Sequence, residues 1–175
     1  MDVRHIPPGR HAPREVNAFI EIPQGGLPVK YELDERSGAL FVDRFLHTSM
    51  LYPSNYGFIP NTMGEDGDAL DIVVVTPMPV VAGCVIRARP VGILLMSDEK
   101  GTDEKVLAVP VDALNPFYAN TKTYEDLPPL LVAQIEHFFR HYKDLEPGKS
   151  ASIGEWAGLD RTYQCINEAI ERAER

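Results

Sequence analysis

The sequence predicts a mainly β protein of the α+β class, a small closed or partly closed β-barrel with two C-terminal helices packed on it. Three observations support this fold class. Short β-type runs separated by turn residues fill the chain from about residue 17 to residue 110. After about residue 126 the apolar spacing changes to a helical period. Prolines number 15 in 175 residues, well above the usual fraction of about 5%, which favours turns over long helices.

Six segments have the composition and length of strands. They are residues 17–22, 29–33, 40–45, 72–76, 85–96 and 106–111. Glycine-containing turns at residues 24–26 and 36–38 separate the first three segments, so we expect successive antiparallel pairing. The first 14 residues carry charges and prolines without an apolar run, and we expect a loose N-terminal arm (1–14) on a single domain spanning residues 1–175.

Two amphipathic helices are expected in the last third of the chain. The first follows Asp126 as its N-cap, and the second follows Asp160 as its N-cap. In each helix the apolar residues recur at spacings of three and four, which places them on one helical face. These residues are Leu131, Ile135, Phe138 and Tyr142 in the first helix, and Tyr163, Ile166, Ile170 and Ala173 in the second.

Charge and cysteine usage restrict the function classes. The formal net charge of −9 repels nucleic acid and anionic membranes, so neither is an expected partner. The longest apolar stretch, residues 70–87, is interrupted by Asp71 and by two prolines, so we expect no membrane span. Cys84 and Cys165 lie far apart without metal-type spacing, which is typical of reduced thiols in a cytoplasmic protein.

Two acidic loops are the most informative part of the sequence. Asp66, Asp68 and Asp71 lie on a glycine-containing loop that runs into an apolar strand, and Asp98 and Asp103 flank a second turn between strands. Crowded carboxylates are stable when they are solvated or neutralised by a cation, so each loop alone is compatible with an ordinary acidic turn. If both loops meet at one rim of the barrel, their hard oxygen ligands indicate a site for several divalent ions.

Cationic and tyrosine side chains supply a possible phosphate site. Each is common on protein surfaces or in cores, but as a set an arginine fork, lysine charges and tyrosine hydroxyls suit phosphate. The set comprises Lys30, Arg44, Tyr52, Tyr56, Tyr142 and Lys143, and Glu32 shares one face of its strand with Lys30. His137 and His141 lie one helical turn apart, as a metal pair does, although histidines on a helix surface or interface are more common.

Taken together, these segments closely resemble the soluble inorganic pyrophosphatases of family I, of the bacterial length class. The order and spacing of the motifs hold from about residue 18 to residue 149. The matching stretches are residues 20–23 (IEIP), 30–32 (KYE), 38–44 (GALFVDR), 52–60 (YPSNYGFIP), 66–71 (DGDALD), 89–92 (RPVG), 98–99 (DE), 103–105 (DEK) and 137–143 (HFFRHYK). Ala69 departs from the family motif, which usually has proline at this position.

The resemblance implies an OB-like five-stranded barrel and a role for each matching residue. Asp68 would be the general base or would orient the water. The implied metal ligands are Asp66, Asp71, Asp98 and Asp103. The implied phosphate ligands are Lys30, Arg44, Tyr56, Tyr142 and Lys143, supported by Glu21, Glu32, Tyr52 and Lys105. About three to four Mg²⁺ ions per site with substrate bound are implied, with Mn²⁺ or Zn²⁺ as possible substitutes.

The activity implied by the resemblance is Mg-dependent hydrolysis of inorganic pyrophosphate to two orthophosphates. The attack would be direct and in line, by a metal-bridging hydroxide, because no serine, cysteine or histidine stands out as a nucleophile beside a base. Bacterial-length relatives form hexamers, often through the histidine-bearing helix, so a cytoplasmic homo-hexamer is expected. Two alternatives from other classes are an oligonucleotide-binding barrel and a non-catalytic protein with a structural calcium site.

Overall fold

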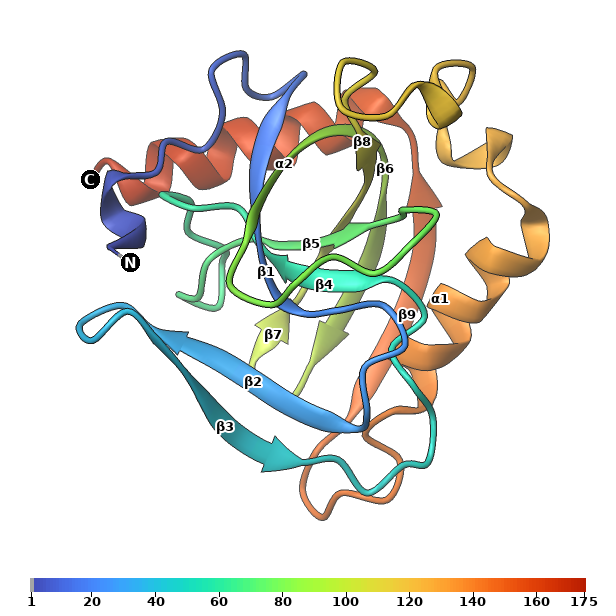
Figure 1. Cartoon of the computed structure of the whole chain (residues 1–175). Coiled ribbons are helices and arrows are strands. Elements are labelled where there is room, and N and C mark those ends of the chain that lie inside the picture. Colours follow the sequence, from blue (N-terminus) through green and yellow to red (C-terminus); the bar gives the residue numbers. More distant parts are fainter. Residues whose placement is uncertain (1) are drawn as a thin grey trace.

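The computed structural model describes residues 2–175, and its centre is a closed ring of five strands (Figure 1). β1 (Val16–Ile22) pairs antiparallel with β4 (Asn55–Phe58), and β4 pairs antiparallel with β5 (Asp71–Val74). β5 runs parallel to β8 (Lys105–Pro110), which pairs antiparallel with β6 (Val85–Asp98). The first residues of β1 pair with β6 and close the ring. The predicted OB-like five-stranded barrel is therefore confirmed.

Four further strands lie off the ring. β2 (Val29–Asp34) and β3 (Ala39–Phe45) form a separate two-stranded hairpin, while β7 (Gly101–Thr102) and β9 (Ala151–Ala157) both pair with the long β6. Of the predicted successive antiparallel pairing, the β2–β3 pair is confirmed, whereas the pairing of β1 with β2 is wrong because β1 pairs with β4 and β6 instead. Strands β4, β7 and β9 were not predicted, and the β5–β8 pair is parallel because β6 is inserted between them in the chain.

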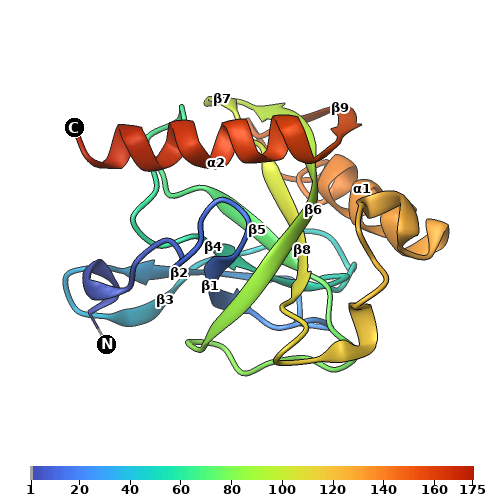
Figure 2. The ribbon, with the colours of Figure 1, turned by 90° about the horizontal axis from the view of Figure 1, so that it is seen from above.

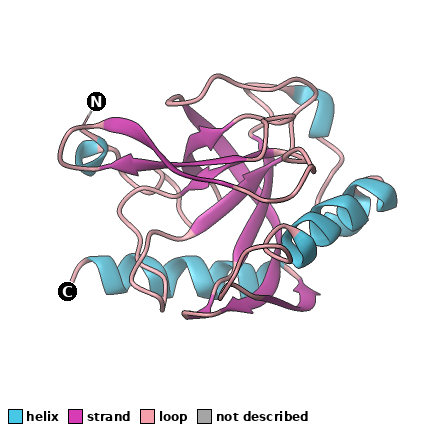
Figure 3. Cartoon of the chain, turned by 90° about the horizontal axis from the view of Figure 1, so that it is seen from below, coloured by secondary structure: helices cyan, strands magenta, loops and turns pink. Residues whose placement is uncertain are grey.

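The two predicted helices are confirmed as α1 (Pro129–His141) and α2 (Leu159–Ala173). Seen from above, α2 lies across one side of the barrel next to β6, and α1 lies beside β9 (Figure 2). Coloured by secondary structure, the helices flank the strands (Figure 3). Short 3₁₀ turns at Val3–His5, Pro116–Tyr118 and Tyr124–Asp126 complete the helical elements. No helix within residues 2–175 is long and apolar enough to cross a membrane.

Both predicted N-caps are wrong. Asp126 ends the 3₁₀ turn that precedes α1, and its carboxylate accepts hydrogen bonds from the backbone N–H groups of Lys122 and Thr123 at 2.8 and 2.9 Å. Pro128 occupies the N-cap position of α1 instead. Asp160 lies in the first turn of α2, whose N-cap is Gly158. There the carboxylate still complements the positive end of the helix dipole.

Helix α1 buries the face that its periodicity predicted. The predicted face of α2 is partly wrong, because Tyr163 and Ile170 are only half-buried and Ala173 is exposed. The buried face of α2 is rotated and consists of Thr162, Cys165, Ile166 and Ala169.

Ile135 and Phe138 of α1 are fully buried in an apolar cluster with Tyr52 and Leu94. Ile166 of α2 is buried in a second cluster, with apolar residues of the ring strands. Burying each large apolar side chain contributes about 1.5–3 kcal/mol, so both helices are fixed firmly to the barrel.

The N-terminal segment, expected as a loose arm, contacts the rest of the chain. Val3 is buried against Phe19 and Phe58. The Asn61 side-chain amide donates to the carbonyl oxygens of Arg4 and Ile6 at 3.1 and 2.7 Å. These contacts hold residues 3–6 next to β1 and β4.

Candidate active site

A cavity of about 720 Å³ lies between the ring and the β2–β3 hairpin, and every site residue predicted from the sequence lines it. The hairpin contributes Lys30 and Arg44, and the ring contributes Tyr56, Asp71 and Lys105. The remaining residues come from β1, from the hairpin strand β2, from the loops, from the end of β6 and from the turn after α1. They are Glu21, Glu32, Tyr52, Asp66, Asp68, Asp98, Asp103, Tyr142 and Lys143. The predicted convergence of the two acidic loops is thus confirmed.

The first acidic loop is folded by its own short contacts. The carboxylate of Asp66 accepts the Asp68 N–H at 3.1 Å, and the Asp68 carbonyl accepts the Gly64 N–H at 2.7 Å. Gly67 has a φ of +90°, a conformation that L side chains rarely adopt, so glycine is required at the turn. Ala69, where the family usually has proline, packs beside Phe58 in the N-terminal apolar cluster. The loop therefore presents Asp66 and Asp68 to the cavity without a proline.

Lys105 joins the two acidic loops at the bottom of the cavity. Its ammonium donates to the carboxylates of Asp71 and Asp103, and the Tyr56 hydroxyl donates to Asp71 at 2.8 Å. The Lys105 side chain is only 3% exposed, against 22% for Asp71 and 10% for Asp103. Burial disfavours the charged lysine, but attraction to the two carboxylates outweighs it and raises the lysine pKa. Lys105 is therefore a permanent cation between two predicted metal ligands.

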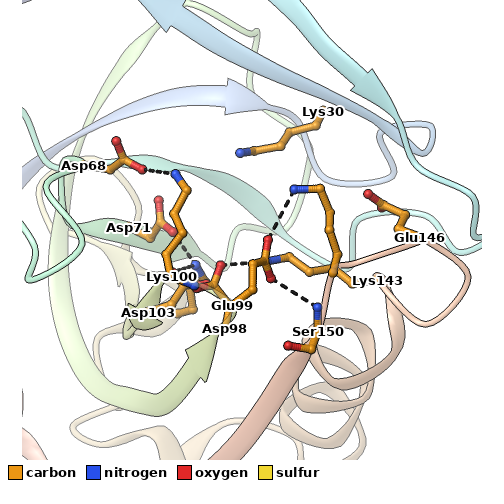
Figure 4. Close-up of polar contacts among 12 residues, drawn as sticks. Lys30, Asp68, Asp71, Asp98, Glu99, Lys100, Asp103, Lys143, Glu146 and Ser150 are labelled. Carbon is orange, nitrogen blue, oxygen red and sulfur yellow. Dashed lines mark hydrogen bonds and ion pairs between the residues drawn. The ribbon is translucent and has the colours of Figure 1, made fainter.

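The second acidic loop is tied to the turn after α1 (Figure 4). Lys143 donates to Asp98 at 2.7 Å and to Glu99 at 3.2 Å. Glu99 also accepts the Ser150 N–H at 3.1 Å and the Lys149 ammonium at 3.3 Å. Burial opposes ionisation of Glu99, but the backbone amides and Lys143 outweigh it and lower its pKa to about 2. Glu99 thus holds Lys143 at the cavity wall.

The predicted phosphate-binding cations are all paired with acids. Arg44 donates through Nε to Glu146 and through Nη1 to Asp43, both at 2.6 Å, and Lys30 donates to Glu32. Sequence reasoning missed Glu146, which is buried and carries one oxygen without a hydrogen-bond partner in residues 2–175. No local motif marks it, because the two partners lie 102 residues apart.

Asp68 differs from the other predicted acids because it faces solvent at the mouth of the cavity. Its side chain is 68% exposed and accepts a hydrogen bond at 3.0 Å from Lys100, which is itself 59% exposed (Figure 4). Sequence reasoning also missed Lys100, whose position in the second acidic loop was the only signal for it. An exposed pair of this kind exchanges its partner readily, because it contributes only about 0–1 kcal/mol.

The donor set fits a hard divalent cation. Four carboxylates offer oxygen ligands in one cavity, those of Asp66, Asp71, Asp98 and Asp103. Burial raises the pKa of Asp66 and Asp71 because it disfavours their charged forms, and a bound cation would offset that cost. Within residues 2–175 no three acidic, histidine or cysteine side chains form a ready metal cluster, and the Lys105 and Lys143 ammonium groups contact the carboxylates in their place. Oxygen donors of this kind suit Mg²⁺ or Mn²⁺.

The remaining candidate ligands lie outside this cavity. The His137 and His141 rings are 4.7 Å apart on α1, and His141 Nδ1 is 2.7 Å from the Asp144 carboxylate. Neither histidine is among the described residues that line the cavity. Cys84 and Cys165 are both free thiols. The chemistry of the cavity therefore depends on carboxylates, cations and tyrosines.

A barrel cavity that combines four candidate metal-ligating carboxylates with an arginine, lysines and tyrosine hydroxyls defines a class of metal-dependent enzymes acting on phosphate compounds. Comparison with known proteins identifies the member of that class. The family model described as inorganic pyrophosphatase matches residues 18–174. The chain therefore belongs to the inorganic pyrophosphatase family.

Individual relatives agree over nearly the whole chain. An inorganic pyrophosphatase of Caulobacter vibrioides is 60% identical, with 98% of this chain and 97% of the relative covered. A crystal structure described as an inorganic phosphatase from Anaplasma phagocytophilum is 50% identical, with a TM-score of 0.95 over 97% of this chain and 99% of the other. The inorganic pyrophosphatase of Thermus thermophilus is 37% identical, with a TM-score of 0.94 and full coverage of both chains.

These comparisons confirm the resemblance inferred from the motifs. The chain is an enzyme, an inorganic diphosphatase, because hydrolysis of pyrophosphate is the activity of its family. The oligonucleotide-binding and structural-calcium interpretations are therefore not supported. The role of each residue in the cavity stays a prediction.

Proposed function

We propose that this chain hydrolyses inorganic pyrophosphate to two orthophosphates in the cavity between the ring and the hairpin, by direct in-line attack of water. The proposal rests on one observation, that carboxylates line one part of the cavity wall and cations line another. Carboxylates from two loops lie at the barrel rim, while Lys30, Arg44 and Lys143 come from the hairpin and from the turn after α1. A substrate between these two walls would contact metal-binding and phosphate-binding groups at once.

Asp66, Asp71, Asp98 and Asp103 would hold Mg²⁺, with about three to four ions per site when substrate is bound. Bound Mg²⁺ would lower the pKa of water and neutralise phosphate charge, and Mn²⁺ or Zn²⁺ would substitute for it. Lys105 contacts both Asp71 and Asp103, and its ammonium opposes the effect of burial, which raises the pKa of Asp71. Tyr56 adds a hydrogen bond that orients the Asp71 carboxylate.

The cations of the second wall would bind the phosphates. Arg44 offers a planar fork to two phosphate oxygens, and Lys30 and Lys143 offer point charges. Tyr142 offers a neutral hydroxyl donor, and the Tyr56 hydroxyl, which donates to Asp71 here, would donate to a phosphate oxygen instead once substrate is bound. Neither hydroxyl adds positive charge that would retain the product. Their rings are held by aromatic contacts, such as that between Tyr56 and Phe139 with centroids 5.9 Å apart. Glu21, Glu32 and Tyr52 support this wall from behind.

Asp68 would accept the proton of the attacking water. It is exposed at the mouth of the cavity, and its only ion-pair partner among the described side chains is the exposed Lys100. Asp66 and Asp71 are more enclosed, and their oxygens are better placed to bind metal. A carboxylate acting as general base contributes about 10²–10⁴-fold to the rate. The leaving phosphate would be stabilised by the cations already fixed in the site.

Phosphate release from pyrophosphate tests the proposal, with Mg²⁺ and with EDTA, for the wild type, Asp103→Ala and Asp68→Asn. We expect EDTA and Asp103→Ala to abolish release. Asp68→Asn should lower kcat about 10²–10⁴-fold with little change in Mg²⁺ binding measured by calorimetry. Equal losses in turnover and Mg²⁺ affinity would show that Asp68 is mainly a ligand. A folded wild-type protein that releases no phosphate with Mg²⁺ would refute the proposed activity.

We also propose that the chain forms a homo-hexamer in the cytoplasm. The support for assembly is the outer face of α1, where Leu130 is exposed and the His137 and His141 rings lie one turn apart. The support for the cytoplasm is the pair of free thiols, which are typical of a reducing compartment. Sedimentation equilibrium tests the first proposal, and a monomer at micromolar concentration would refute it. Recovery of the protein outside the cytoplasmic fraction of cells would refute the second.

A further inference from the structure

A partly exposed polar stripe on α2 lies beside the backs of both acidic loops. Arg161, Cys165, Glu168 and Arg172 follow one another at spacings of four, three and four, so they lie on one side of the helix. We call these four residues the α2 stripe. They lie outside the cavity that holds the proposed catalytic groups, so the stripe cannot touch a substrate there.

Glu104 connects the second acidic loop to the α2 stripe. One of its carboxylate oxygens accepts a hydrogen bond from Arg161 Nη2 at 2.6 Å, and the other accepts from the Cys165 thiol at 2.9 Å. Both partners are on α2, and the Glu104 side chain is only 11% exposed. Since breaking a buried charge pair leaves an uncompensated ion, this contact is costly to lose. It fixes Glu104 to the helix.

The contact between Glu104 and α2 affects the cavity because of how side chains alternate along the chain around Glu104. Successive side chains of an extended segment point to opposite sides. Asp103 and Lys105 both reach the cavity, where they contact each other, whereas Glu104 between them points to α2. Fixing Glu104 on one side therefore fixes the direction of Asp103 on the other.

The first acidic loop is attached to the same helix. Arg172 Nη1 donates to the Met63 carbonyl at 2.7 Å, and the Met63 N–H donates to the Ala169 carbonyl at 2.9 Å. Arg172 also approaches Glu65 at 3.8 Å, directly before Asp66. One small space of about 20 Å³ is lined by Asp66, Asp71 and Asp103 together with Glu104, Cys165 and Arg172. The backs of the proposed ligands thus meet the α2 stripe.

We propose that Glu104, Arg161 and Arg172 are positioning residues that hold the two acidic loops at the separation required for divalent-metal binding. Helix α2 is a rigid element, and it contacts Met63 before one loop and Glu104 within the other. Residues that support metal ligands from behind typically change metal affinity or activity about 10–100-fold when substituted. The inference rests on the proposed ligand role of Asp66 and Asp103.

The test compares Glu104→Gln, Arg161→Met, their double variant and Arg161→Lys with the wild type. Glu171→Gln is the matched control, since Glu171 is an exposed acid on the same helix. Mg²⁺ binding is measured by calorimetry with the metal alone, the melting temperature is measured in EDTA, and phosphate release is measured at limiting and at saturating Mg²⁺. Asp103→Ala is included to report on the ligand role itself.

We expect Glu104→Gln and Arg161→Met each to weaken Mg²⁺ binding about 10-fold, and the double variant to lose no more than either. Arg161→Lys should recover part of the affinity, because it restores a cation beside Glu104. Saturating Mg²⁺ should return kcat to within about twofold of the wild type. The Glu171→Gln control should bind Mg²⁺ like the wild type.

Three results would overturn the inference. The first is unchanged Mg²⁺ binding in Glu104→Gln and Arg161→Met while Asp103→Ala loses it, which leaves the proposed function intact. The second is a lowered melting temperature of Glu104→Gln and Arg161→Met with kcat reduced equally at every Mg²⁺ concentration. That result would show that the contact stabilises the fold but does not position metal ligands. The third is unchanged Mg²⁺ binding in Asp103→Ala, which refutes the ligand assignment as well.

Discussion

Replacing Lys105 with methionine isolates the largest electrostatic contact in the site. Methionine keeps most of the apolar stem but removes the ammonium, which leaves Asp71 and Asp103 facing each other without their shared cation. Two buried like charges repel, and each also lacks the water that would solvate it. We therefore expect the metal-free variant to lose stability while the fold is retained.

The structure sets the size of the loss. Breaking a buried ion pair by removing one partner costs about 3–5 kcal/mol. The Asp71 side chain is 22% exposed and keeps the hydrogen bond from Tyr56, which places the expected loss near the lower end, about 3 kcal/mol. For a chain of this length, about 3 kcal/mol corresponds to a melting temperature roughly 6–12 °C lower.

The assay is thermal unfolding in EDTA and in saturating Mg²⁺, with Lys100→Met as the control. The Lys100–Asp68 pair is exposed on both sides, so its loss should change stability by no more than about 1 kcal/mol. Mg²⁺ at 100 times its Kd stabilises a folded protein by about 2.7 kcal/mol. We expect a larger gain for Lys105→Met than for the wild type, because the uncompensated carboxylates attract the ion more strongly.

Two outcomes would refute this reasoning. If Lys105→Met and Lys100→Met lose the same stability in EDTA, burial does not decide the strength of these pairs. If Mg²⁺ raises the melting temperature of Lys105→Met no more than that of the wild type, the lysine and the metal do not act on the same carboxylates.

Two further changes test the packing around the site. Burial raises the pKa of Glu21 to about 8 from 4.5, so ionising it destabilises the fold, and stability should fall between pH 4.5 and pH 8. In urea unfolding, the wild type should lose a few kcal/mol of unfolding free energy over this pH range, and Glu21→Gln should not show this loss. Equal unfolding curves of the wild type at both pH values would contradict the prediction. A Cβ on Gly57 would lie 1.8 Å from the Phe19 carbonyl oxygen, so Gly57→Ala should destabilise by about 3 kcal/mol or more. Gly158→Ala, which meets no atom within 4 Å, should be near neutral in the same melts.

The local spacing of apolar residues was sufficient to predict the helices and strands that bury one regular face. The predicted helices and most ring strands are confirmed because apolar residues recur at the helical or strand period. Strand β4 was missed because its sequence, Asn55-Tyr56-Gly57-Phe58, lacks that pattern and forms through tertiary contacts. The Asn55 side chain donates to the Val74 carbonyl at 2.9 Å and to the Thr76 hydroxyl at 2.7 Å. A single sequence window cannot show such contacts.

The cavity was more predictable than the network around it. All the residues taken from the motifs line one cavity, because acidic loops at strand ends converge when the ring closes. The partners of those residues could not be predicted, since nothing near Arg44 in the sequence points to Glu146, and nothing near Glu104 points to Cys165, 61 residues away. Such pairs depend on which elements the closed ring brings together.

The charge of the cavity gives a physical reason for the proposed metal to bind before the substrate. Acidic side chains outnumber basic ones along its wall, on a chain whose net charge is already −9. Pyrophosphate is an anion, so it would be repelled by this wall unless cations reverse the local field. Arg44 and Lys143 cannot do so alone, because Glu146 and Asp98 already neutralise them. Divalent ions bound to the carboxylates would neutralise their negative charge, so that the cavity wall would attract phosphate. The same ions would thus serve both substrate binding and activation of water.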